Sequence, residues 1–184
     1  MLNIAGFLAG LRRWLTSGVA SAQTSKENAG LAALRVDANA GNASAQTSLG
    51  NAYHDGRGVA QDDVEAVSWY RKAAEQGDAA AQSNLGAMSE LGQGVPQDDV
   101  QAAEWYRKAA DQGLADAQFN LGVMYDRGLG VPQDLVEAHK WRNLAASRAS
   151  TENQKESADS RDALAKLMTP TQIADERDTR ECSD

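Results

Sequence analysis

A unit of 36 residues recurs along this chain. Its clearest markers are a tryptophan and a leucine that return at that spacing (105−69 and 141−105 for the tryptophans). Repetition at a fixed spacing of this size indicates stacked supersecondary units, each burying its apolar face against its neighbours. The markers are Trp69, Trp105 and Trp141, and Leu49, Leu85 and Leu121. The sequence therefore predicts a short repeat array.

Each unit holds two apolar stripes with helical spacing. In the first unit the stripes are Ala45, Leu49, Ala52 and Tyr53, followed by Ala66, Trp69, Tyr70 and Ala73. Between the two helices, paired glycines supply the positive φ that ends one helix and reverses the chain. A further glycine lies inside each first helix at a cost of about 1 kcal/mol relative to alanine, so we expect another helix backbone to pass close to it. These internal glycines are Gly50, Gly86 and Gly122.

Each second helix is predicted to begin at an aspartate. Asp62, Asp98 and Asp134 stand three residues before Glu65, Gln101 and Glu137, which is capping-box spacing. Adjacent carboxylates such as Asp62-Asp63 also suggest a metal or acid–base pair. Neighbouring side chains on a helix do not converge on one point, however, and carboxylates in a first turn complement the helix dipole. We therefore interpret them as caps.

Composition excludes several functional classes. The net charge of −8 and pI near 4.8 argue against nucleic-acid binding, which needs clustered Lys and Arg. The single cysteine, Cys182, excludes an internal disulfide framework and a cysteine zinc site. His54 and His139, expected to be exposed, lack a second histidine at i+3 or i+4, so we expect no metal and no cofactor. The sequence contains no run of about 18 apolar residues, which is the length that a membrane-spanning helix needs.

We divide the chain into four parts. Residues 1–28 form an amphipathic segment and linker, 29–44 an N-terminal half-repeat cap, 45–148 three repeats, and 149–184 C-terminal capping helices with a charged tail. The apolar stripe of residues 1–16 would dock on the array or contact a membrane surface. A secretory signal carries its positive charge before its apolar run, whereas Arg12 and Arg13, on another face of the helix, interrupt that run, which favours a cytoplasmic chain. Ala20-Ser21-Ala22 resembles a cleavage site and keeps export open.

The middle unit resembles the Sel1-like repeat, a relative of the tetratricopeptide repeat. The matching residues are Ala81, Leu85-Gly86, Gly92, Gly94-Val95-Pro96-Gln97-Asp98, Ala102, Trp105-Tyr106, Lys108-Ala109-Ala110, Gln112-Gly113 and Ala117-Gln118. The resemblance covers about residues 30–148 and implies an all-α, right-handed superhelix of three helix pairs with capping helices. Departures include Ser89 and Arg142 in place of tyrosines; Ser89 leaves either a void or room for Met88 or Leu91 to move inward.

The resemblance implies a non-catalytic scaffold, which we expect to be a monomer that binds a protein or peptide segment. If first helices line a concave groove, as in related solenoids, the groove side chains follow by offset. They are Thr47, Asn51, His54, Ser83, Ala87, Glu90, Phe119, Val123 and Asp126. Phe119 and Val123 are apolar outside the core stripe; they are either contact residues or covered by the C-terminal helices. The alternative, an envelope hydrolase like some cysteine-rich relatives, lacks a Ser-x-x-Lys motif.

Overall fold

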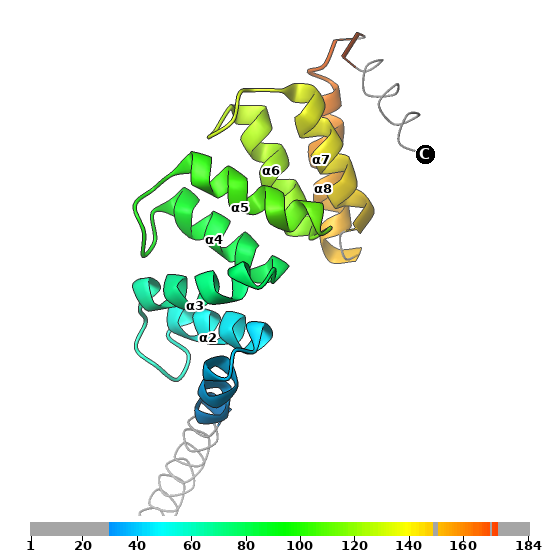
Figure 1. Ribbon diagram of the computed structural model, residues 1–184. Helices are drawn as coiled ribbons and strands as arrows, with labels where there is room; N and C mark the ends of the chain where they lie inside the picture. Colours follow the sequence, from blue (N-terminus) through cyan, green and yellow to red (C-terminus); the bar gives the residue numbers. More distant parts are fainter. Residues whose placement is uncertain (1–29, 149–150, 170, 173–184) are drawn as a thin grey trace, which may run out of the picture.

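The computed structural model describes residues 30–148, 151–169 and 171–172, and within them the regular structure is helical. A helix over 30–39 leads into an array of helices connected by short loops (Figure 1). The array consists of α2 (Ala43–Asp55), α3 (Asp63–Glu75), α4 (Ala79–Leu91), α5 (Asp99–Asp111), α6 (Ala115–Arg127), α7 (Leu135–Arg148) and α8 (Thr151–Ala165).

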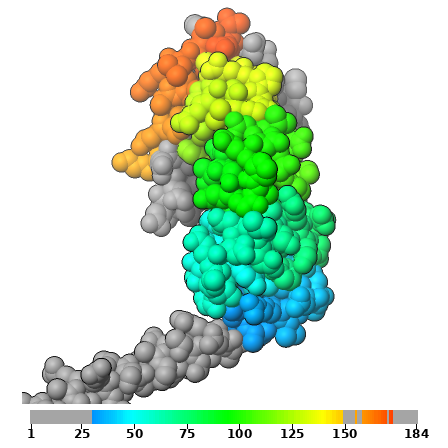
Figure 2. Space-filling view, turned by 90° about the vertical axis from the view of Figure 1, so that its left-hand side faces the viewer, coloured from blue at the N-terminus to red at the C-terminus, as the bar shows by residue number. Residues whose placement is uncertain are grey.

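The helices form an all-α superhelix in which each packs on its neighbours in the sequence. The pairs α2–α3, α4–α5 and α6–α7 are the three repeats, and α8 packs on α7. The repeats follow one another as successive blocks along an elongated molecule (Figure 2). The predicted helix pairs are thus confirmed, although α2 begins at Ala43, two residues before the predicted repeat boundary at 45.

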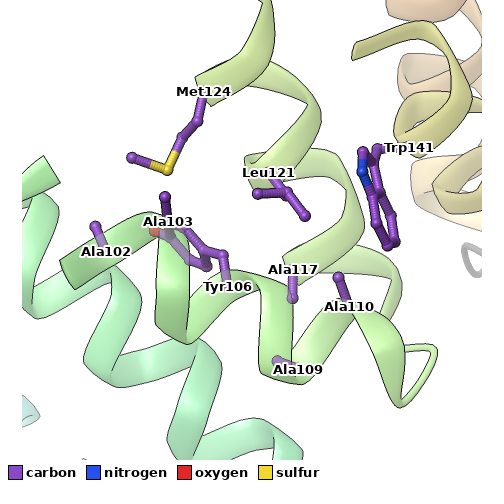
Figure 3. Packing of buried hydrophobic residues seen from close by; sticks show 9 residues of the cluster. All are labelled: Ala102, Ala103, Tyr106, Ala109, Ala110, Ala117, Leu121, Met124 and Trp141. Atoms are coloured by element: carbon purple, nitrogen blue, oxygen red, sulfur yellow. The ribbon is translucent and has the colours of Figure 1, made fainter. Parts of the chain in front are cut away.

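Alanine allows the helices to approach closely around a few large side chains. Tyr106 and Leu121 are 1% and 0% exposed, and lie among small residues of α5 and α6 (Figure 3). Trp69 and Trp141 are buried as predicted. Trp105 is only half-buried, with the Lys108 ammonium 4.0 Å from its ring centre. The core is therefore a chain of similar clusters, one at each joint, as expected for a solenoid.

The internal glycines make room for a side chain more than for a backbone. A Cβ on Gly50 would lie 2.5 Å from the Tyr70 ring, and one on Gly86 would lie 2.7 Å from the Tyr106 ring. Only at Gly122 does a backbone atom come close, the Ala138 carbonyl at 3.1 Å. The expectation of a passing helix backbone was therefore wrong for the first two repeats.

The aspartate caps form, but the predicted reciprocal half of the capping box is replaced by other contacts. Asp62 Oδ1 accepts from the Glu65 N–H at 3.0 Å. The Glu65 carboxylate accepts instead from the Trp69 indole N–H at 3.0 Å. The Asp62 N–H donates to the Tyr53 carbonyl at 2.9 Å, closing the turn after α2. The cap thus joins both helices of the repeat.

A ladder of glutamines connects successive helices. Gln46, Gln82 and Gln118 each donate from Nε2 to a carbonyl in the last turn of the preceding second helix, at 3.1, 3.2 and 3.0 Å. Gln76 and Gln112 then donate to the Oε1 atoms of Gln46 and Gln82, both at 2.8 Å. In the third repeat this outer position is Arg148, and the buried Gln118 Oε1 has no partner among the described residues.

Ser89 is accommodated without inward movement of Leu91. Its side chain is 1% exposed and its hydroxyl donates to Gln101 Oε1 at 3.2 Å, whereas Leu91 remains 64% exposed. At the far end, Arg142 bonds the Ser160 carbonyl of α8 at 3.4 Å. A capping box forms in both directions between Thr169 and Gln172, at 2.8 and 3.3 Å. Residues 1–29, with the predicted amphipathic segment, lie outside the described residues, as does the tail after 172.

Candidate partner-binding surface

The first helices of adjacent repeats touch along the predicted row of binding residues. Asn84 of α4 donates from Nδ2 to Asn51 Oδ1 of α2 at 3.1 Å. Thr47 of α2 donates to Asp78, the N-cap of α4, at 3.1 Å. These contacts make α2 and α4 one continuous surface.

Most polar members of the row are held by the fold. Glu90 accepts from the Tyr106 hydroxyl at 2.9 Å, and Asn51 accepts from the Tyr70 hydroxyl at 2.7 Å. Asp126 forms a 2.7 Å ion pair with Arg142, which thereby takes over the role of the tyrosine it replaces. A ligand that binds these groups would contact side chains that already bond to a second helix.

Two further members occupy different environments from those expected. Thr47 is only 7% exposed and bonds both Asp78 and the Ala43 carbonyl, so its hydroxyl is part of a joint instead of an open groove. His54 is half-buried, contrary to the predicted exposure, because its Nδ1 lies 2.7 Å from Asp63 Oδ1 of α3. His139 is half-buried as well. The repeat offset places Thr47 and His54 on a first helix, as observed, but it does not give their contacts.

Burial changes the ionisation of the two tyrosines behind the row. Burial, followed by the negative charges of Asp55 and Asp63, raises the pKa of Tyr70 from 10.0 to about 12. Burial and the Glu90 carboxylate raise the pKa of Tyr106 as well. Both hydroxyls therefore stay protonated donors around neutral pH.

The remaining members form the less polar part of the row. Phe119 and Val123 of α6 are both half-buried and belong to none of the buried core clusters. Ala87 of α4 is half-buried against the core of the next joint, and Ser83 is half-buried one turn before it. Leu91, which sequence offset did not select, ends α4 at 64% exposure. The apolar surface of the row is thus concentrated on α4 and α6.

A pocket of about 540 Å³ lies where the helix over 30–39 meets α2. The sequence pattern does not predict this pocket, although Asn51 belongs both to its wall and to the predicted row. It is lined by Gly30, Leu31, Leu34, Ser48, Asn51, Ala52, Arg57 and Gly58. The pocket thus lies at the N-terminal end of the row of first helices.

The described side chains form no recognisable reaction centre. They contain no cluster of three or more His, Cys, Asp or Glu that could hold a metal ion. The pair of His54 and Asp63 would orient a base, but no hydroxyl of the described residues hydrogen-bonds that ring. The hydrolase alternative gains no support.

Among the described residues, no helix is long and apolar enough to cross a membrane.

Comparisons with known proteins agree with this architecture. The Sel1 repeat family model matches residues 43–78, 79–114 and 115–150. The crystal structure of a Sel1 repeat protein from Oxalobacter formigenes is similar, with 36% identity, a TM-score of 0.65, and coverage of 73% of this chain and 56% of that one. No match was found among curated proteins.

A second solved structure is similar over a smaller share of its own length. It is c5321, described as a protective antigen of uropathogenic Escherichia coli with an SLR fold, with 34% identity and a TM-score of 0.50. The alignment covers 80% of this chain and 38% of that one. This chain therefore spans about half or less of the length of each solved relative.

Sel1 repeat proteins are generally protein-interaction scaffolds. With three matched repeats over residues 43–150, the chain belongs to the Sel1 repeat family.

Proposed function

We propose that this protein is a non-catalytic scaffold that binds an extended peptide or protein segment along its first helices, with its apolar contacts on α4 and α6. The observation that carries this proposal is the environment of Phe119 and Val123. They lie at i and i+4 on α6, partly exposed and outside the core clusters. Partly exposed apolar pairs of this kind favour contact with a partner.

The polar part of the row supports specificity more than affinity. Asn51, Glu90 and Asp126 each bond a side chain of a second helix, so they are held in fixed orientations before any ligand arrives. Fixed polar groups reduce the ordering cost of binding and discriminate between ligands. The apolar pair would then supply the main favourable burial.

A peptide-display library, selected on the full chain, provides a direct test. We expect the recovered peptides to bind with micromolar affinity and to share apolar anchor residues. The double substitution Phe119→Ser with Val123→Ser should weaken binding at least about tenfold, equivalent to 1.4 kcal/mol. Titration calorimetry of one recovered peptide against each variant provides the measurement.

The matched control is Val64→Ser, because Val64 is an apolar residue of α3 that is 67% exposed and outside the row. It should leave the affinity unchanged. Equal losses for the control and the double variant would contradict the proposed surface, as would peptides that bind both variants with the wild-type affinity.

A further inference from the structure

At the N-terminal pocket, two side chains are smaller than those at the equivalent positions of the following repeats. Leu34 occupies the position that is Tyr70 and Tyr106 in the next two joints, 36 and 72 residues on. Ala52 likewise occupies the position that is Met88 and Met124 in the next two repeats. Those four larger side chains are each 3% exposed or less, so they fill the corresponding spaces.

Within the described residues, the helix over 30–39 has no first helix of its own, whereas each second helix of a complete repeat has one. Tyr70 of α3 is covered by α2, against Gly50 and Asn51. Leu31 and Leu34 present the equivalent face; they pack against a cluster that includes residues of α2 and Trp69 of α3, and both remain only half-buried. One side of this helix is therefore available to a first helix of its own.

The chain itself contains a segment with the pattern of a first helix. Ile4, Leu8 and Leu11 have the same spacing as Ala45, Leu49 and Ala52 of α2, 41 residues later. Its side chains are larger at two of these three positions. On the facing helix the change is opposite, since Ala33 and Leu34 replace Trp69 and Tyr70. The two changes compensate in volume, as a packed core requires.

Chain length permits this segment to reach the pocket. Gly30 lies on the pocket wall, and 29 residues precede it. A helix of residues 4–15 would be about 18 Å long. The intervening residues 16–29 can span up to about 46 Å. Tethering also gives the segment an effective concentration of about millimolar, which favours it over a partner in solution.

We propose that residues 4–15 pack on the helix over 30–39 as the first helix of an incomplete leading repeat, and that their apolar side chains fill the pocket beside Leu34 and Ala52. Docking in this way would place the segment next to Asn51, at the N-terminal end of the row formed by the first helices.

Hydrogen–deuterium exchange on the full chain tests this arrangement. The variant Leu8→Asp with Leu11→Asp places two charges on the apolar stripe, and we expect the amides of residues 31–39 to exchange at least about tenfold faster. The control, Arg12→Gln with Arg13→Gln, alters the same segment off that stripe and should leave exchange unchanged. Amides of α5 and α6 report that the array remains folded in both variants.

Three outcomes would overturn the proposal. Equal exchange of residues 31–39 in wild type and in the Leu8→Asp, Leu11→Asp variant would show that the segment does not cover this helix. Protection that increases with protein concentration would assign the pocket to a second copy of the chain. Protection that disappears when anionic lipid vesicles are added, together with sedimentation of the protein, would assign the segment to a membrane surface.

Discussion

Oδ1 of Asn51 accepts two hydrogen bonds, from the Tyr70 hydroxyl at 2.7 Å and from Asn84 Nδ2 at 3.1 Å. One side chain of α2 thus joins α3 of its own repeat to α4 of the next. Asn51→Ala would leave a buried hydroxyl and a half-buried amide without their acceptor. We expect a loss of about 1–3 kcal/mol in the free energy of unfolding, measured by urea denaturation.

Ser48→Ala is the control for this substitution, since Ser48 lies one turn away on α2 and is exposed. Its effect should stay within about 0.5 kcal/mol. If both variants unfolded at the same urea concentration, Asn51 would not join the repeats. The comparison also matters for binding experiments, because Asn51→Ala would change stability and partner contact together.

Gly86→Ala should destabilise the array, because the added Cβ would meet the Tyr106 ring at 2.7 Å. Overpacking of this kind costs about 1–3 kcal/mol. In contrast, Gly30→Ala has nothing within 4 Å and should be neutral or stabilising by up to about 1 kcal/mol, the difference in helix propensity. Thermal unfolding of the two variants measures both effects.

A double-mutant cycle identifies the cause of the Gly86 effect. Tyr106→Leu removes the ring that the new Cβ would meet, so the loss from Gly86→Ala should be smaller in that background. Additive losses would mean that the glycine is required for a reason other than the ring of Tyr106.

Arg148→Gln should stabilise the last repeat. Gln76 and Gln112 donate to Gln46 and Gln82 at 2.8 Å, but Arg148 stands at the third position of this series and Gln118 Oε1 has no partner among the described residues. Supplying a donor to a buried acceptor is expected to contribute about 0.5–1.5 kcal/mol. Arg148→Ala removes the same charge without a donor; equal stability of the two variants would refute the explanation.

The fold was predictable because its determinants are local and repeated. Trp69 and Asp62 recur at a fixed spacing, and each occurrence marks a second helix and its N-terminal cap. The contact of Gly50 was interpreted incorrectly because spacing alone does not distinguish a neighbouring backbone from the ring of Tyr70. That distinction depends on the distance between helices, which no single helix encodes.

The candidate surface was less predictable, because an offset of 36 residues transfers a position but not its partners. His54, Glu90 and Asp126 share one position, yet they bond Asp63, Tyr106 and Arg142, respectively. The pocket depends on what is missing in the half-repeat, and it becomes visible only when Leu34 is compared with its buried counterparts. The repeat spacing therefore predicts which helix carries each of these residues, but not the contacts that the residue makes.

Stability should fall at alkaline pH as Tyr70 ionises in the unfolded chain. Its pKa is raised from 10.0 to about 12 in the fold, so below pH 10 both states keep the proton and the full stability is present. Between pH 10 and about 12 the unfolded state releases the proton first, and the free energy of unfolding decreases as pH rises. The raised pKa of Tyr106 acts in the same direction.

Thermal unfolding from pH 8 to 12 should therefore show a steep fall in Tm above pH 10. Tyr70→Phe, which cannot ionise at this position, should reduce that slope. Identical slopes for wild type and Tyr70→Phe would mean that the Tyr70 hydroxyl is not buried against Asn51.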